Sequence, residues 1–372
     1  MVRLPQLESV PTPALVLDRP ALVENIASMA ARAAAAGVTL RPHAKTHKSL
    51  AVAELQRAHG ADALTVATVH EAECFAAGGF DDFLLTAPAI GDWRLDRVVE
   101  LAREARVRVT VDSPAAVTAL DDACRVSGAQ IGFVWEVDCG VGRFGTQPGA
   151  STAEAVARAV DSARYASFDG LLAFGGHAYA AADDAALEAA ARDERAAVTE
   201  TAELLRGRGI EVSMLSVGTT PTSHRIQANG GITEIRPGNY VFYDATQVAL
   251  GLVPLERCAL SVLATVVSRP TPDRIILDAG SKAIAAERLT PRAPGFALVR
   301  GLPGLHVERL YEEQAIVRGD SDLNVGDRVQ VVPNHACAAV NLHDELLVVE
   351  HAEVLDVWPV DARGWRTERV RV

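Results

Sequence analysis

Lysine is scarce in this chain. Of 36 lysine and arginine residues only three are lysine, at Lys45, Lys48 and Lys282. Arginine supplies almost every other cation, which suggests that a retained lysine performs a task that arginine cannot. Only a primary amine loses its proton readily and forms an imine with an aldehyde, because a guanidinium stays charged. Chance retention of three lysines is the competing interpretation.

Long hydrophobic runs are also missing. No apolar stretch approaches the roughly 20 residues that span a membrane. The N-terminal segment MVRLPQLESVPTP has no apolar core followed by a cleavage site, so it does not resemble a signal peptide. The cysteines are few, odd in number and widely spaced, which is typical of reduced thiols. They are Cys74, Cys124, Cys139, Cys258 and Cys337. Together these features predict a cytoplasmic protein with no membrane partner.

Basic clusters are absent as well. The formal net charge is −12, and the basic residues are scattered along the chain. Because like charges repel, this balance argues against nucleic acid or an anionic membrane surface as the main partner. With 372 residues, 49% of them hydrophobic, the chain can bury a large core in one large and one smaller domain, or in two of middling size.

Short apolar runs alternate with Ala-rich amphipathic stretches over the first 250 residues. A first strand at 12–17 leads into a helix with Asp18 near its cap and Pro20 in its first turn. Eight β units follow, at 38–41, 63–68, 83–86, 107–111, 130–137, 170–174, 212–217 and 233–235. This alternation predicts an α/β protein with a (β/α)8 TIM-like barrel; a doubly wound sheet is the alternative.

The pattern changes at about residue 251, where intervening helices disappear. Strand-like runs at 260–267, 274–277, 328–332, 346–349 and 354–358 are separated by turn signals. We therefore predict a barrel domain at 19–250 and a C-terminal β domain at 251–372.

A polar cluster follows the first barrel strand, at the end where barrels place their active sites. It reads Arg41-Pro-His-Ala-Lys-Thr-His-Lys48. Two lysines and two histidines would be costly to bury without partners. Either this segment is a solvated basic loop, or neighbouring cations lower the pKa of one amine, which can then form a Schiff base or act as a general base.

Other strand ends carry residues suited to an aromatic, anionic ligand. Arg143 lies in a glycine-rich turn after the fifth barrel strand and could contact an anionic oxygen. His177 and Tyr179 follow the sixth strand and could stack on a ring and bond to its edge, although each alone is more often structural. The segments 216–222 and 236–240 end the last two barrel units, where barrels bind phosphate through backbone amides.

The β domain offers one pair of metal-ligand residues. His335 and Cys337 are two residues apart, and on a strand they would point to the same face and could share a metal ion. Such pairs are also common by accident. A site with two protein ligands would leave positions open to water or substrate, as a catalytic metal requires.

Taken together, these motifs resemble a known family. Arg41-Pro-His-Ala-Lys-Thr-His-Lys48 and Pro333-Asn-His-Ala-Cys337 are similar to motifs of the D-serine dehydratase and D-threonine aldolase group. This group belongs to the alanine-racemase-like (fold type III) pyridoxal-phosphate enzymes. The resemblance covers nearly the whole chain and implies a β domain that includes the N-terminal strand within residues 1–18. It also implies a homodimer, and pyridoxal 5'-phosphate bound at Lys45 rather than at Lys48.

The resemblance further implies individual roles. Arg143 would contact the phenolic oxygen, His177 would lie near the ring as a catalytic residue, and Tyr179 would lie near the pyridine nitrogen. Arg236 stands where alanine racemases place a pyridine-contacting arginine. The phosphate contacts would come from Gly218, Thr219, Gly238 and Asn239, and the metal ligands would be His335 and Cys337. Zinc is favoured because thiolates prefer it, with manganese or magnesium as alternatives.

The implied activity is that of a lyase on β-hydroxy D-amino acids, which are small-molecule substrates. Loss of the α-proton and hydroxide would give a 2-oxo acid and ammonia, as in a D-serine dehydratase. Removal of the hydroxyl proton would instead give glycine and an aldehyde, as in a D-threonine aldolase. The pairing of histidine with cysteine favours dehydration. The segment Tyr311-Glu-Glu-Gln314 stands where relatives often end in histidine, which leaves the exact substrate open.

Two other classes are less favoured. An amino-acid racemase would need a tyrosine as second acid/base in the β domain, and Asp278-Ala-Gly-Ser-Lys-Ala283 has none, although Lys282 could replace it. A non-catalytic pyridoxal-phosphate-binding protein of the single-barrel type would lack the segment after residue 251.

Overall fold

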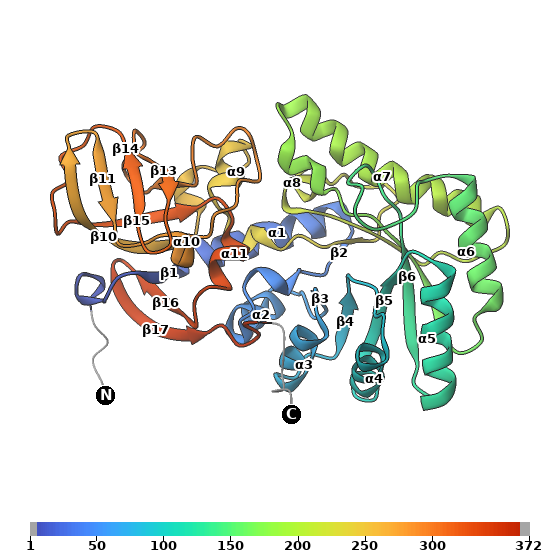
Figure 1. Ribbon diagram of the computed structural model, residues 1–372. Helices are drawn as coiled ribbons and strands as arrows, with labels where there is room; N and C mark the ends of the chain where they lie inside the picture. Colours follow the sequence, from blue (N-terminus) through green and yellow to red (C-terminus); the bar gives the residue numbers. More distant parts are fainter. Residues whose placement is uncertain (1–5, 365–372) are drawn as a thin grey trace.

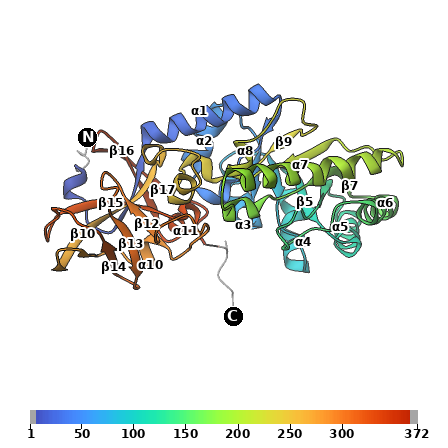
Figure 2. The ribbon, with the colours of Figure 1, turned by 90° about the horizontal axis from the view of Figure 1, so that it is seen from above.

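The computed structural model describes residues 6–364; the outermost parts of the predicted β domain, 1–5 and 365–372, lie outside this range. Figure 1 shows two units beside each other, a helix-covered barrel and a sheet-rich domain. Seen from above in Figure 2, helix α1 (Arg19–Ala36) runs along both units. No helix within the described residues is long and apolar enough to cross a membrane.

The first unit is built on an eight-stranded parallel sheet in the order β2-β9-β8-β7-β6-β5-β4-β3. Its ends meet, because His43 pairs in parallel with Thr65 and the Thr65 N–H donates to the Pro42 carbonyl at 2.8 Å. The predicted barrel is thus confirmed over the doubly wound sheet. Its strands are β2 (Thr39–Leu40), β3 (Leu64–Val66), β4 (Asp82–Leu85), β5 (Arg106–Val111), β6 (Ile131–Glu136), β7 (Ser167–Leu172), β8 (Met214–Val217) and β9 (Glu234–Ile235).

Local caps explain where the barrel helices begin and end. The Asp18 carboxylate accepts from Ala21 N–H at the start of α1, and Gly37 ends the helix with a φ of 68°. Ser113 and Gly128 do the same for α5. The remaining helices of this unit are α2 (Leu50–Ala58), α3 (Val69–Ala77), α4 (Asp92–Leu101), α5 (Pro114–Ser127), α6 (Ala150–Ser162), α7 (Asp184–Arg206), α8 (Thr220–Ser223) and α9 (Ala245–Ala249).

The second unit is a nine-stranded sheet in the order β11-β14-β13-β12-β15-β10-β1-β16-β17. The long strand β10 also pairs with β11, so the strands from β11 to β10 close into a small barrel, and β1, β16 and β17 extend it. The predicted C-terminal β domain is confirmed. Its strands are β1 (Ala14–Asp18), β10 (Leu260–Thr271), β11 (Arg274–Leu277), β12 (Ala297–Val299), β13 (His306–Leu310), β14 (Ala315–Arg318), β15 (Arg328–Pro333), β16 (Glu345–Glu350) and β17 (Glu353–Pro359).

The N-terminal strand β1 lies in this sheet, between β10 and β16. That pairing supports the proposal that the β domain comprises residues 251–372 together with the N-terminal strand. Strands β12, β13 and β14 escaped the sequence prediction, because they are short and lie among turns rich in proline, glycine and charge.

Two short helices interrupt the β domain, α10 (Ser281–Ile284) and α11 (Ala336–Val340). The prediction that His335 and Cys337 lie on a strand is wrong: His335 caps α11 and Cys337 lies in its first turn. The strand β15 ends at Pro333, and the alanine-rich sequence that follows has high helix propensity.

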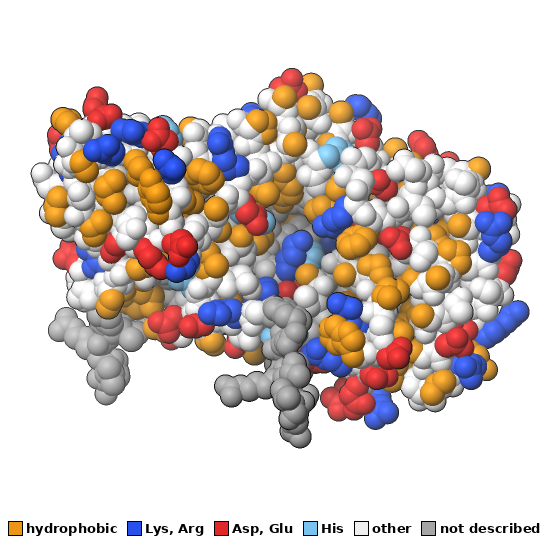
Figure 3. All heavy atoms as spheres, in the orientation of Figure 1, with side chains coloured by type: hydrophobic (Ala, Val, Ile, Leu, Met, Phe, Trp, Pro, Cys, Tyr) orange, Lys and Arg blue, Asp and Glu red, His pale blue; other side chains and the backbone are white. Residues whose placement is uncertain are grey.

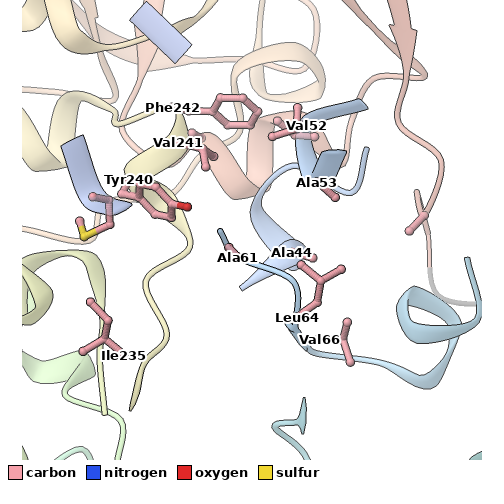
Figure 4. Packing of buried hydrophobic residues seen from close by; sticks show 14 of the residues in the cluster. Ala44, Val52, Ala53, Ala61, Leu64, Val66, Ile235, Tyr240, Val241 and Phe242 are labelled. Carbon is pink, nitrogen blue, oxygen red and sulfur yellow. The ribbon is translucent and has the colours of Figure 1, made fainter. Parts of the chain in front are cut away.

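The two units share one hydrophobic core. Figure 4 shows Val52 of α2 beside Phe242, which follows β9, and Leu64 of β3 beside Ala44. The same cluster continues to Val331 in β15 and Val348 in β16. The C-terminal ends of the barrel strands are therefore held against the β domain by continuous packing.

Buried charged side chains form a network inside the barrel, around Asp82 and Glu234 at the starts of β4 and β9. The Arg41 guanidinium donates to Glu234 at 2.7 Å and to Asp82 at 2.6 Å. Arg108 donates to the same oxygen of Asp82 at 2.7 Å and to Asp169 at 2.6 Å. Both arginine side chains are at most 5% exposed, so each depends on its carboxylates for charge compensation.

Replacing the shared carboxylate is expected to be costly. Asp82→Ala leaves two buried guanidinium groups short of a partner, and we expect the free energy of unfolding in urea to fall by about 3 kcal/mol. Asp122→Ala is the control, because it breaks an exposed pair with Arg125, worth less than about 0.5 kcal/mol. Similar losses in both variants would contradict the role assigned to Asp82.

Candidate active site

A cavity of about 380 Å³ lies at the C-terminal ends of the barrel strands, where they face the β domain. Figure 3 shows basic and histidine side chains gathered at the hollow between the two units. The β domain contributes Leu289, His335 and Cys337 to its wall. The barrel contributes the predicted residues Lys45, Arg143, Tyr179, Gly218, Thr219, Arg236, Gly238 and Asn239.

His177 is the one predicted site residue that does not line this cavity. Its ring packs against the loop after β6, because a Cβ added to Gly140 would lie only 3.8 Å from Cε1 of His177. Its Nδ1 is buried and has no hydrogen-bond partner within residues 6–364. Contact between His177 and a cofactor ring stays a prediction that this arrangement does not support.

The Lys45 amine projects into the cavity from a short 3-10 helix, Ala44–Thr46. Its Nζ lies 5.8 Å from the centre of the Phe174 ring. Burial lowers the pKa of Lys45; Cys337 opposes this shift, whereas Arg143 and Arg236 add to it. A larger share of this amine is therefore uncharged at neutral pH, as a nucleophile requires.

The other two lysines are occupied elsewhere. Lys48 donates to the Asn341 side chain at 2.8 Å and to the Gly364 carbonyl at 3.3 Å, and it lies 3.5 Å from Glu71. Lys282 is 59% exposed and pairs with two glutamates of the β domain. Among the lysines, only Lys45 lines the cavity.

Two further cations lie near Lys45. The Arg143 guanidinium lies over the Phe174 ring at 4.6 Å from its centre. Arg236 is buried and fixed, donating to the Ser216 hydroxyl at 2.6 Å and to the Ala173 carbonyl at 2.7 Å. A positive cluster of this kind suits a ligand that carries anionic oxygens.

Glu136 at the end of β6 also lines the cavity and escaped the sequence analysis. Burial raises its pKa to about 7, against the opposing effect of Arg236 and Arg143. A single glutamate at the end of the apolar run Ile131-Gly-Phe-Val-Trp was the available signal.

The loops predicted to bind phosphate are already partly hydrogen-bonded. Gly218 N–H donates to Glu194 at 2.9 Å, and Thr219 N–H donates to the Thr222 hydroxyl at 2.9 Å. Phosphate contacts through these two amides would require both bonds to break. Gly238 packs so tightly that an added Cβ would come within 2.6 Å of the Thr46 hydroxyl, which leaves room only for backbone at this wall.

Tyr179 lies on the same side of the cavity. Burial raises the pKa of its hydroxyl, and the nearby backbone of Thr220 opposes this shift. The group therefore stays protonated and can donate a hydrogen bond. Its contact with Thr220 lies by the predicted phosphate loop; contact with a pyridine nitrogen stays a prediction.

The predicted metal ligands lie together at the start of α11. His335 contacts Glu287 through Nδ1, and its ring interacts electrostatically with Cys337. Burial by itself would lower the pKa of His335 and raise the pKa of Cys337. Cys337 and Glu287 nevertheless raise the pKa of His335 to about 11, and His335 lowers the pKa of Cys337. Both shifts favour the ion pair of a thiolate with an imidazolium. The Thr46 hydroxyl, next to Lys45, lies 3.2 Å from the Cys337 sulfur.

This pair has the chemistry of a two-ligand metal site. A thiolate and an imidazole are ligands for zinc, and a carboxylate at the second ring nitrogen orients a metal-binding histidine. No group of three or more histidine, cysteine or acidic side chains in the described part of the chain could hold a metal. The described residues therefore offer a pair of metal ligands rather than a complete coordination shell.

Comparisons with known proteins agree with this architecture. Residues 17–246 match the family model of the alanine racemase N-terminal domain, and residues 259–349 match a putative serine dehydratase domain. The chain therefore belongs to the alanine racemase N-terminal-domain family. Within it, the chain falls among pyridoxal-phosphate-dependent lyases that also carry the dehydratase domain.

Relatives resemble the chain over nearly its full length. A D-threonine aldolase from Arthrobacter sp. is 36% identical, over 96% of this chain and 94% of its own. The solved D-threo-3-hydroxyaspartate dehydratase from Delftia sp. HT23 has a TM-score of 0.89 at 33% identity, over 97% of this chain and 99% of its own. A cysteine-to-alanine mutant of a D-threo-3-hydroxyaspartate dehydratase, described as the metal-free form, has a TM-score of 0.88 at 33% identity, over 97% of this chain and 100% of its own.

The raised pKa of Glu136 makes stability depend on pH. The folded protein holds this proton up to about pH 7, whereas the ordinary value is 4.5, so the stabilisation is full below 4.5 and is lost as pH rises through 7. Glu136→Gln stays neutral. In metal- and cofactor-free protein, we expect its free energy of unfolding relative to wild type to rise by roughly 2 kcal/mol between pH 4.5 and 8. A difference that does not change with pH would contradict the shift.

Proposed function

We propose that the chain is a pyridoxal-phosphate- and metal-dependent lyase acting on β-hydroxy D-amino acids. Its main reaction would be dehydration to a 2-oxo acid and ammonia, as in a D-serine dehydratase. One observation carries this proposal: the Lys45 amine, whose pKa is lowered, lines the same cavity as the paired side chains of Cys337 and His335.

The cavity fits pyridoxal phosphate by several features. Lys45 supplies the amine that captures the aldehyde, and Arg143 and Arg236 supply positive charge for its oxygens. His43 Nδ1 and Asn239 Oδ1 are buried without a partner among residues 6–364, and both residues line the cavity. Gly238 lets the backbone of the predicted phosphate loop pack closely against Thr46 and His43. Bound pyridoxal phosphate would delocalise the electron pair left at Cα and weaken the Cα–H and Cα–Cβ bonds.

The residues of this chain would then divide the work. The Lys45 amine, released when substrate displaces it, would take the α-proton, because its lowered pKa favours the free base. His335 and Cys337 would hold a divalent metal, zinc before manganese or magnesium, that stabilises the departing hydroxide. A related dehydratase mutant is described as being in the metal-free form, which implies a metal in that relative and supports a metal in this chain.

The aldolase reaction is the alternative. The Arthrobacter relative named D-threonine aldolase, similar over nearly its full length, favours it. The same site would cleave Cα–Cβ if a base removed the β-hydroxyl proton instead of the α-proton. Racemisation is less supported, since Lys282 is paired at the surface and does not line the cavity. A non-catalytic role is disfavoured by the contribution of the β domain to the cavity.

We further propose a cytoplasmic homodimer without nucleic-acid or membrane partners. The net charge of −12 supports the absence of nucleic-acid and membrane partners. The five unpaired cysteines support a cytoplasmic location. The dimer follows from the family resemblance, and sedimentation of the purified protein tests it.

The cofactor assignment predicts a site-specific label. Borohydride treatment of protein loaded with pyridoxal phosphate should fix the cofactor to Lys45. The Lys45→Ala variant should lose the visible absorbance, and its turnover should fall by at least about 1,000-fold. Lys48→Arg is the matched control, because it keeps a cation at the contact with Glu71, and it should still be labelled. A label on Lys48 in peptide mass analysis would refute the assignment.

The metal assignment predicts a selective loss of product. With zinc and D-serine or D-threonine, wild type should release pyruvate or 2-oxobutyrate. Cys337→Ala should retain cofactor absorbance but lose more than about 100-fold in turnover, because the leaving hydroxide loses its Lewis acid. Glycine and acetaldehyde from D-threonine would establish the aldolase reaction instead. Unchanged turnover after complete chelation of the metal would exclude both metal-assisted routes.

A further inference from the structure

A fully buried carboxylate lies behind the proposed active site. Asp244 is 0% exposed and caps helix α9, where its Oδ1 accepts from Gln247 N–H at 3.2 Å. Its Oδ2 accepts from the Asn239 side-chain amide at 2.5 Å and from Ala336 N–H at 3.0 Å. One oxygen atom therefore joins the barrel loop after β9 to helix α11 of the β domain.

The two donors belong to different halves of the proposed site. Asn239 lines the cavity beside the predicted phosphate loop, and its Oδ1 has no partner in the described part of the chain. Ala336 lies between the two proposed metal ligands, so its N–H fixes the turn that aims His335 and Cys337. A ligand bound beside Asn239 orders one segment, and a metal bound at α11 orders the other. Both segments donate a hydrogen bond to the same oxygen, Oδ2 of Asp244.

We propose that Asp244 is a positioning residue that couples cofactor binding to metal binding; this inference rests on the proposed function. A buried carboxylate that loses a donor is strongly destabilised, so Asp244 holds the Asn239 loop and the α11 turn in place together. A ligand that orders one segment lowers the entropic cost of ordering the other. Each ligand therefore tightens the binding of the other, by the same factor.

A second contact, between α9 and the segment just before α11, provides the matched control. Thr246, also in α9, donates through its hydroxyl to the Asn334 carbonyl at 2.6 Å, next to the proposed ligand His335. It supports the metal turn without contacting the cofactor loop. Loosening this contact should weaken metal binding whether or not the cofactor is bound.

The wild-type protein tests the coupling directly. Protein stripped of metal and cofactor is titrated with zinc, by competition with a chromogenic chelator, with and without pyridoxal phosphate, and then with pyridoxal phosphate with and without zinc. We expect each affinity to rise about 5-fold or more, by equal factors within error. Equal zinc affinities in both states would overturn the coupling. A chain that binds both ligands independently leaves the proposed function intact, whereas one that takes up no cofactor refutes that function.

Variants then assign the coupling to Asp244. Asp244→Asn keeps the shape but weakens the shared acceptor, and Asp244→Ala removes it, so the coupling factor should fall towards 1. Thr246→Val should lower zinc affinity equally in both cofactor states and keep the factor of wild type. Loss of coupling in Thr246→Val to the same extent would show that Asp244 is not the link. If Asp244→Ala fails to fold, Asp244→Asn and the wild-type cycle still decide.

Discussion

The cavity depends on one electrostatic constraint: the three cations Lys45, Arg143 and Arg236 line it together, and of these only Lys45 can readily lose its charge. Arg143 and Arg236 keep their protons under all ordinary conditions. Burial and the repulsion of these two neighbours therefore act on the amine of Lys45 and lower its pKa. The scarcity of lysine in the chain gains a physical meaning here, because arginine at this position would stay charged and could not act as a nucleophile.

The β domain supplies the opposite charge. His335 and Lys45 stabilise a negative charge on Cys337 and lower its pKa against the effect of burial, and Cys337 in turn opposes the fall in the pKa of Lys45. The amine and the thiol thus adjust each other across the boundary between two units that share one core. The chemistry proposed for the chain needs both, and neither domain alone provides them.

How much could be predicted from sequence follows from the range of the interactions. The barrel, the Lys45 loop and the proposed metal ligands His335 and Cys337 are marked by local patterns of hydrophobicity and polar residues. Asp244 and Glu287 carry no such mark, because their partners are distant in sequence and only the fold brings them together. The helix at α11 was missed for a related reason: a pair two residues apart fits a strand, and the contact of Ala336 N–H with Asp244 is invisible in the sequence.

The segment after Lys45 is tied to the far end of the chain. Lys48 holds the Gly364 carbonyl, Ala362 N–H donates to the Lys48 carbonyl at 2.9 Å, and the Asp361 carboxylate accepts from Leu50 N–H at the start of α2 at 2.7 Å. During synthesis, residues 45–50 leave the ribosome long before these partners exist. The nascent barrel therefore cannot complete the loop that follows Lys45 until the β domain has also been made.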